Sequence, residues 1–262
     1  MSEFWLGERA GIRGYRLVGY DTVGSTNAEA LRAAASGDVG DVWFAALGQT
    51  QGRGRRGRSW DTTHGNLAAS LLVLPDADPA VAATLGFVAG VALERALATL
   101  LPRGAAEADR RIALKWPNDV LAGGAKLAGI LLEAERRRDG RVAIVVGFGV
   151  NVVAAPAGLP YPATSLRALG IEVPAGAVLA ALADAWVDCY DAWDNGRGVA
   201  DILRQWRAAA AGVGAPVAVD RGGDIVRGIF DSIDEAGRLI VHADDGRRIV
   251  VTAGDVHFGA TA

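Results

Sequence analysis

The sequence predicts an α+β fold, in which a mixed, largely antiparallel sheet is flanked by helices and followed by a small C-terminal β-barrel. Three observations predict it. Apolar runs separated by glycine turns fill residues 112–150, amphipathic stretches suited to helices cover residues 175–194 and 199–210, and short β runs with Gly- and Asp-containing turns begin at Ala215.

The first half of the chain is expected to alternate helices and strands. A helix is expected over residues 24–38, because Thr26 and Glu29 have capping-box spacing and Gly37 stops it. The apolar segments after it are expected as two strands and one long buried helix: residues 41–49, residues 67–74 and a helix that begins near Pro79. A charged, glycine-rich loop therefore joins two strands and opens no helix.

The middle of the chain is expected to form an antiparallel meander. A strand at residues 111–116 is broken by the polar turn at 117–119, and the strands after it are joined by turns at Gly123–Gly124 and Asp139–Gly140. The polar turn should therefore project from one end of the sheet.

The change from helices to short strands near Gly212–Gly214 marks the expected domain boundary. It divides the 262 residues into a large domain, residues 1–213, and a small one, residues 214–262. This length suffices for one large and one small core.

Composition excludes several classes of protein. The net charge is -3 and the pI about 5.7, so bulk electrostatic binding of nucleic acid or of an acidic membrane is not expected. Cys189 is the single cysteine, and with three scattered histidines it makes no zinc-ligand pattern. The N-terminus lacks the core of a signal peptide, and the longest apolar run, residues 81–93, is expected to be too short to cross a bilayer. We therefore expect a cytoplasmic protein.

The segment QTQGRGRRGRSW, residues 49–60, places four arginines and three glycines in residues 52–58, which we call the arginine loop. Its Gly-x-Gly-x-x-Gly pattern is typical of dinucleotide sites, but those need a helix after the loop. A nucleic-acid-binding arm is a second interpretation, although such arms are usually longer and repeated. A third is a mobile lid, which a phosphate orders over a reactive group by relieving guanidinium repulsion. A solvated turn without a role is the plain alternative.

Two lysine-containing motifs follow the loop. In KWPNDV, residues 115–120, Asn118 offers amide hydrogen bonds to a base or phosphate and Asp119 offers a ligand to magnesium or its water, although a simple turn explains the same residues. In KLAGILLE, residues 126–133, Lys126 is suited to polarise a carboxylate or α-phosphate, although a lysine at a strand start usually reaches to solvent. Gly129 suggests close approach of a backbone.

Two further motifs carry polar side chains. GSTN, residues 24–27, is an ordinary helix start, and it also supplies neutral donors and acceptors suited to a small polar ring such as a ureido group. GFGVN, residues 147–151, is an ordinary strand end, and its Asn151 is suited to contact an adenine or a ribose.

In this order, STN, GRGRRGR, KWPND, KLAGIL and GFGVN resemble the motifs of the biotin protein ligases, over residues from about 20 to 260. The resemblance implies a fold like that of class II synthetases and biotin–lipoate ligases, with an SH3-like C-terminal barrel. It also implies a reaction in which biotin and ATP, with Mg²⁺, give biotinyl-5′-AMP, from which biotin passes to a lysine of an acceptor protein.

The resemblance implies roles for residues of each motif. The residues expected to act in catalysis are Lys126, Arg53 and Arg55. Those expected to bind biotin are Ser25, Thr26, Asn27, Gln49, Gly52, Arg53, Gly54, Arg55, Trp60, Lys126 and Gly129. Those expected to bind the nucleotide are Arg55, Arg56, Arg58, Trp60, Lys115, Asn118 and Asn151, and the expected magnesium ligand is Asp119. No residue of the small domain is assigned.

The expected acceptors are the biotin carboxyl carrier proteins or domains of acyl-CoA carboxylases and pyruvate carboxylase. The pattern begins near residue 20, which leaves no room for the helix-turn-helix of many bacterial members, so we expect no DNA and no membrane partner. Thr62, Thr63 and His64 stand where many members carry a proline, which changes the loop after Trp60. Two alternatives remain open: a lipoate or octanoate ligase or transferase on the same fold, and a non-enzymatic module that binds nucleotides or nucleic acid with the arginine loop.

Overall fold

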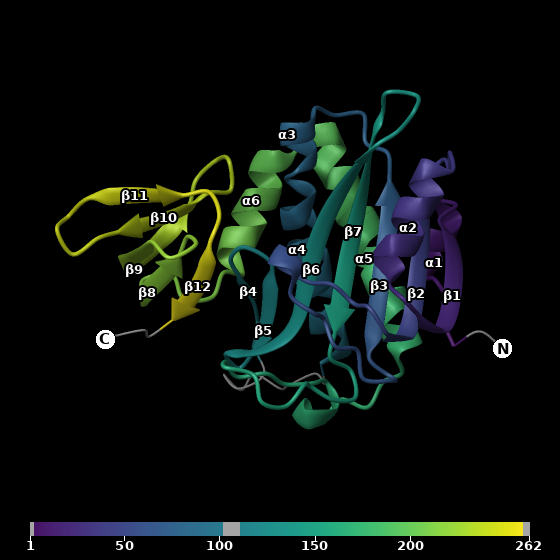
Figure 1. The fold of residues 1–262 in the computed structure, drawn as a ribbon, viewed down its shortest axis with the longest axis horizontal. Coiled ribbons are helices and arrows are strands. Elements are labelled where there is room, and N and C mark those ends of the chain that lie inside the picture. Colours follow the sequence, from purple (N-terminus) through teal and green to yellow (C-terminus); the bar gives the residue numbers. More distant parts are fainter. Residues whose placement is uncertain (1–2, 102–110, 259–262) are drawn as a thin grey trace.

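A seven-stranded mixed sheet forms the centre of the larger part of the molecule (Figure 1). The computed structural model describes residues 3–101 and 111–258. In chain order the strands are β1 Arg16–Val23, β2 Val42–Gln49, β3 Leu67–Val73, β4 Ile112–Lys115, β5 Asp119–Ala122, β6 Ala125–Arg136 and β7 Val142–Val150. Their order in the sheet is β1-β2-β3-β7-β6-β5-β4, and only β1 and β2 run parallel. The predicted meander and the mixed sheet are confirmed.

Helices lie on both faces of this sheet (Figure 1). They are α1 Glu8–Ile12, α2 Thr26–Ala35, α3 Pro79–Ala82, α4 Leu85–Leu100, α5 Ala175–Trp193 and α6 Val199–Ala208, with short 3-10 turns at Arg55–Gly57, Arg167–Leu169 and Asp194–Gly196. The main core lies under α4 and α5, where Phe148 contacts both Trp43 and Trp186. Because side chains alternate along a strand, the neighbouring Phe44 faces the other way, into a small core under α2. The face that carries α2 is only partly covered.

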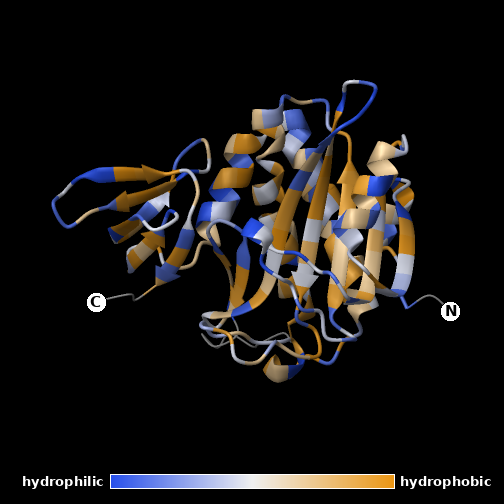
Figure 2. Cartoon of the chain, viewed as in Figure 1, coloured by the Kyte–Doolittle hydropathy of each residue, from blue (hydrophilic) through white to orange (hydrophobic). Residues whose placement is uncertain are grey.

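The apolar segment around α4 is a core helix. Contrary to the expectation from the 81–93 run, Pro79–Leu100 is long and apolar enough to cross a bilayer by length and composition. More than half of that window is buried inside the protein, where α4 packs against α5. Figure 2 shows the hydrophobic colour concentrated on these helices and the central strands. The apolar residues of the segment are therefore explained by the core.

The expected single helix from Pro79 is two helices, broken after α3. Thr84 makes the break: its hydroxyl donates to the carbonyl oxygen of Val81 at 2.6 Å and accepts from Trp193 Nε1 at 2.8 Å. A threonine hydroxyl that bonds back to the chain competes with regular helical geometry. The break also satisfies the indole N–H of a fully buried tryptophan.

The start of α2 lies one residue earlier than capping-box spacing predicts. Ser25 is the N-cap, and its hydroxyl accepts from the N–H of Ala28 at 3.4 Å. Glu29 does not complete the box, because its carboxylate pairs with Arg32. Because Thr26 is not the cap, its hydroxyl turns toward the sheet, where it contacts Gln49 and Ser70.

The C-terminal segment forms a separate five-stranded antiparallel sheet beside α6 and β4 (Figure 1). Its strands are β8 Pro216–Asp220, β9 Ile225–Ile233, β10 Leu239–His242, β11 Arg248–Val251 and β12 Asp255–Phe258. Their order is β11-β10-β9-β8-β12. Trp116 Nε1 donates to the carbonyl oxygen of Gly237 at 2.9 Å, which ties the small sheet to the end of β4. On the same small sheet, β12 lies beside the arginine loop, where its Asp255 contacts Arg56 and Arg58.

Candidate functional site

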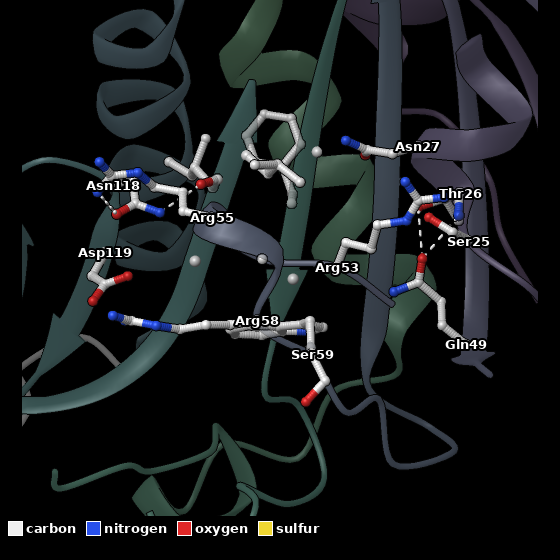
Figure 3. A pocket seen from close by; sticks show the side chains of 18 of the residues that line it. Ser25, Thr26, Asn27, Gln49, Arg53, Arg55, Arg58, Ser59, Asn118 and Asp119 are labelled. Atoms are coloured by element: carbon white, nitrogen blue, oxygen red, sulfur yellow. Dashed lines mark hydrogen bonds between the residues drawn. The ribbon is translucent and has the colours of Figure 1, made fainter. Parts of the chain in front are cut away.

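A cavity opens on the face of the sheet that carries α2, beneath the arginine loop (Figure 3). The expected site residues on its wall are Ser25, Thr26, Asn27, Gln49, Arg53, Gly54, Arg55, Arg58, Trp60, Asn118, Asp119, Lys126 and Gly129. Residues that sequence reasoning did not assign, among them Ser59, Gly147, Gly149, Tyr161 and Asp255, also line it. Four expected residues do not: Gly52, Arg56, Lys115 and Asn151. The fold therefore gathers most of five separate motifs around one cavity.

At the end of the cavity beside α2, the side chains that α2 and β2 contribute are neutral and polar. Gln49 Oε1 accepts from the N–H of Thr26 at 2.8 Å and from its hydroxyl at 3.2 Å, while Gln49 Nε2 donates to Thr62 Oγ1 at 3.3 Å. These bonds fix the Gln49 amide in one orientation. Figure 3 shows the Arg53 side chain extending toward this end, where Ser25 and Thr26 lie. The end can therefore present donors and acceptors of fixed position to an uncharged polar group.

Asn27 is held by two residues that sequence reasoning missed. Its Nδ2 donates to Glu133 Oε2 at 2.7 Å, and the Ser70 hydroxyl donates to its Oδ1. Ser70 also lies 2.7 Å from Thr26 Oγ1 and is fully buried. A signal existed in the sequence, since Ser70 is the one hydroxyl in an apolar strand and occupies a position that faces α2. Glu133 and Ser70 together orient the Asn27 amide.

Glycines on β6 and β7 make room for the side chains of the site. A Cβ on Gly147 would overlap Asn27, and a Cβ on Gly149 would overlap the indole of Trp60. Gly129 lies opposite Gly149 in the β6–β7 register, and a Cβ there would lie 3.1 Å from the same indole. Trp60 therefore lies flat on bare backbone, as the close approach expected at Gly129 requires.

Asn151 is not on the cavity wall, although the same motif carries it. It is buried, its Nδ2 donates to the carbonyl oxygen of Thr164 at 3.0 Å, and its Oδ1 has no partner in the part of the chain that the structure describes. In GFGVN, therefore, the two glycines line the cavity, and the asparagine that was expected to contact the nucleotide does not.

The arginine loop is folded down over the cavity. The N–H of Gly54 donates to the carbonyl oxygen of Arg58 at 2.7 Å, and the N–H of Trp60 donates to that of Gly52 at 3.0 Å. A Cβ on Gly52 would overlap the Trp60 carbonyl oxygen, so this glycine closes the base of the loop. Arg56 has a positive φ of 56° at the tip, and its side chain bonds Asp255 and does not line the cavity.

Arg55 and Asn118 join the loop to the sheet. Arg55 Nη1 donates to Asn118 Oδ1 at 3.2 Å, and Asn118 Nδ2 donates to the carbonyl oxygen of Ile130 at 2.7 Å (Figure 3). Burial lowers the pKa of the Arg55 guanidinium, which still carries its charge at neutral pH. A half-buried cation with one neutral partner is a favourable place for an anion.

Lys126 and Asp119 form an ion pair at the charged end of the cavity, with Nζ and Oδ1 2.7 Å apart. The ammonium also lies 5.5 Å from the ring centroids of Trp60 and Tyr161. The predicted convergence of Lys126 and Asp119 across the Gly123–Gly124 turn is confirmed. Tyr161, which sequence reasoning missed, comes from the irregular segment after β7, where no pattern indicates its position.

The described residues include no group of three or more acidic, histidine or cysteine side chains arranged to hold a metal ion. Asp119 offers a carboxylate beside Lys126. Mg²⁺ is often held by only one or two carboxylates together with substrate phosphates, so Asp119 fits an ion that arrives with a nucleotide. The donor set does not fit a metal that stays bound without substrate.

Asp255, the first residue of β12, connects the small sheet to the arginine loop. Its Oδ2 accepts from Arg56 Nη1 at 3.2 Å and from Arg58 Nη2. Lys115 lines a neighbouring cavity on the same side, with Nζ 5.4 Å from the ring centroid of Phe258, and burial lowers its pKa. Asp255 and Phe258 lie far from the loop in sequence, so no spacing rule could place them there.

Comparisons with known proteins agree with this architecture. A model described as the Biotin/lipoate A/B protein ligase family matches residues 38–151, and one described as the Biotin protein ligase C terminal domain matches residues 212–259. The chain is 41% identical over 241 residues to the biotin–[acetyl-CoA-carboxylase] ligase of Paracoccus denitrificans, with 90% of this chain and 97% of that protein covered.

A second relative and a solved structure extend the similarity. The biotin–[acetyl-CoA-carboxylase] ligase of Mycobacterium tuberculosis is 38% identical over 242 residues, with 89% of this chain and 85% of that protein covered. The structure of the biotin protein ligase from Aquifex aeolicus in complex with biotin and ATP superposes with a TM-score of 0.75. It covers 93% of this chain and 99% of its own, and at 22% identity it shows the same fold.

The contact between Trp60 and the glycine face can be tested without a ligand. In Gly149→Ala the new methyl group overlaps the indole, so Trp60 and the arginine loop should lift from the sheet. We expect trypsin to cleave within residues 52–58 about tenfold faster, which corresponds to about 1.4 kcal/mol of easier local opening. Gly86→Ala is the control, because its nearest neighbour lies 3.9 Å away. Equal cleavage rates in the two variants would mean that Trp60 does not anchor the loop.

Proposed function

The chain belongs to the biotin protein ligase family, and on this premise we propose how its cavity performs the reaction of a biotin–[acetyl-CoA-carboxylase] ligase. The enzyme activates biotin with ATP to biotinyl-5′-AMP and then transfers biotin to a lysine of an acceptor protein. The observation that carries the assignment of roles is the two-ended cavity, neutral beside α2 and charged beside β5 and β6. The two ends match the two parts of an acyl adenylate.

The neutral end is suited to the ureido ring of biotin. That ring is uncharged and carries both N–H donors and a carbonyl acceptor. Ser25, Thr26 and Gln49 present hydroxyl and amide groups there, and Asn27 is oriented beside them. A site built from neutral groups in fixed orientation discriminates through the hydrogen bonds that a wrong ligand leaves unmade. We infer that lipoate, which has no ureido group, is a poor substrate.

In the first step, a carboxylate oxygen of biotin attacks the α-phosphorus of ATP, the bond to the β-phosphate breaks and pyrophosphate leaves. Both the carboxylate of biotin and the triphosphate of ATP are negatively charged, so their repulsion must be overcome before this bond can form. Lys126 lies at the charged end with its ammonium paired with Asp119, and Arg55 lines the same cavity and is bonded to the neighbouring Asn118. Cations that are already held where charge develops stabilise the transition state of adenylate formation, because they need not move during the reaction. Magnesium, when bound with the nucleotide, neutralises further phosphate charge, and Asp119 is the residue suited to contact it.

The arginine loop protects the activated intermediate. An acyl adenylate is a mixed anhydride that water hydrolyses, so a cover over the cavity preserves it until the acceptor arrives. Arg53 and Arg55 face inward from the loop, and Arg58 is bonded to Asp255 of the small sheet. We propose that phosphate orders the loop by accepting hydrogen bonds from these guanidinium groups.

In the second step, the acceptor amine attacks the acyl carbon, an amide bond forms and AMP leaves. Acetyl-CoA carboxylase is the acceptor in the names of the similar enzymes. We propose that the acceptor is its biotin carboxyl carrier protein or domain, that other acyl-CoA carboxylases and pyruvate carboxylase serve equally, and that the reaction takes place in the cytoplasm. We propose no DNA or membrane partner, in keeping with the net charge of -3.

Exchange of label between pyrophosphate and ATP tests the activation step. We expect exchange to require biotin and Mg²⁺, and lipoate or octanoate to support it at least about a hundredfold less well, because the buried polar groups of the neutral end would be left unpaired. Exchange supported by lipoate as well as by biotin would instead identify a lipoate ligase. Folded protein without any exchange would exclude acyl activation.

Lys126→Met keeps the length of the side chain and removes its charge. We expect biotin-dependent exchange to fall about 10²- to 10³-fold, because the lost cation acts where charge develops. Some stability should also be lost, because Asp119 is left without its ion-pair partner, so exchange is compared on protein shown to be folded. Exchange within twofold of the wild type would remove Lys126 from its role.

Glu133→Gln tests the orientation of Asn27. The variant amide can donate to Asn27 as well as accept from it, so the Asn27 side chain loses its fixed direction. We expect the KM for biotin to rise about tenfold, which corresponds to the loss of one hydrogen bond, and kcat to stay nearly unchanged. Glu135→Gln, two residues along the same strand, is the control. A fall in kcat at unchanged KM would contradict a positioning role.

A further inference from the structure

The chain contains very few primary amines. Of its 27 lysines and arginines only two are lysines, Lys115 and Lys126, so that 25 are arginines. Lysine is ordinarily among the commonest residues of soluble proteins. The described exposed positions that carry a positive side chain, such as Arg197, Arg204 and Arg247, all carry a guanidinium. The outer surface therefore presents no lysine to a reagent in solution.

Both lysines lie at or beside the candidate site. Lys126 is on the cavity wall, its side chain is 17% exposed and its ammonium is paired with Asp119. Lys115 lies in the adjoining cavity over the ring of Phe258. The two lysines thus lie at the cavity and beside it, where the proposed function uses a compact cation. All other lysine-or-arginine positions of the sequence carry arginine.

This distribution has a chemical consequence for the proposed reaction. When an amine meets an acyl adenylate, nitrogen attacks the acyl carbon, a C–N bond forms, the C–O bond to the phosphate breaks, AMP leaves and the amine proton passes to water. A guanidinium does not enter this reaction, because it remains protonated and has no lone pair to offer. An enzyme that makes such a reagent is itself exposed to it at the highest local concentration.

We propose that the arginine-for-lysine surface protects the enzyme from acylation by its own intermediate. The inference rests on the proposed function, since only an enzyme that forms an amine-reactive product gains from lacking amines. Apart from the α-amine, adenylate that escapes the cavity then finds no exposed amine on this chain and reacts with water or with another protein. The surface also keeps its positive charges, because arginine replaces lysine without changing net charge.

A variant with amines restored tests the proposal. In the triple variant Arg197→Lys, Arg204→Lys and Arg247→Lys, each position is highly exposed, with side-chain exposures of 74%, 68% and 74%. None of these residues belongs to the site, and each of the exposed ion pairs contributes little to stability. The matched control replaces the same three residues by glutamine, which removes the guanidinium groups and adds no reactive amine.

Each protein is incubated with biotin, ATP and Mg²⁺ without an acceptor, and biotin on the chain is located by intact-mass and peptide mass spectrometry. We expect the wild type and the glutamine control to carry label only on the α-amine, which is the more reactive type of amine and serves as an internal standard. We expect the lysine variant to carry label at the three new positions as well.

Two results would overturn the proposal. One is labelling of the wild type at Lys115 or Lys126, which would show that its own lysines are acceptors. The other is a lysine variant no more labelled than the glutamine control, which would show that exposed lysines are not at risk. Pyrophosphate exchange, measured on the same preparations, separates these results from a failure of the proposed function, in which exchange itself is absent.

Discussion

The structure depends on a strip of bare backbone at the centre of the sheet. Gly129, Gly147 and Gly149 carry no side chains on the face toward α2, so Trp60 and Asn27 can lie against the strands themselves. The opposite face of the same strands is filled by large residues such as Phe148. One sheet therefore supplies a packed core on one side and the floor of a cavity on the other.

The polar groups of the strands and of α2 around this floor fall into two sets. Near α2, hydroxyl and amide groups satisfy one another through Gln49 and Ser70, and this fixes their directions at little electrostatic cost. Near β5, Lys126 and Asp119 form a close ion pair. The arginine loop spans both sets, and Asp255 ties it to the small sheet. Movement of the small sheet would therefore also shift the arginine loop.

Much of this was predictable from the sequence because the motifs are local. The resemblance of STN, GRGRRGR and KWPND to the motifs of the biotin protein ligases supplied most of the cavity residues, and the strand and turn signals placed Lys126 near Asp119. Contacts between distant segments could not be predicted in this way. Asp255 and Glu133 meet their partners only after the two sheets and α2 have packed, and Tyr161 lies in a segment without periodicity. Asn151 shows the converse error: a motif predicted a ligand contact, and burial directs its side chain to Thr164.

In the proposed complex, one acyl adenylate lies along this floor, with its ring beside α2 and its phosphate beneath the arginine loop. A crystal structure of the protein with biotinyl-5′-AMP tests it most directly. We expect the ureido group within hydrogen-bonding distance of Ser25, Thr26 or Gln49, and the phosphate as an acceptor from Lys126 and from Arg53 or Arg55. A phosphate bound away from all three of these cations, or a ring bound outside the neutral end, would contradict it.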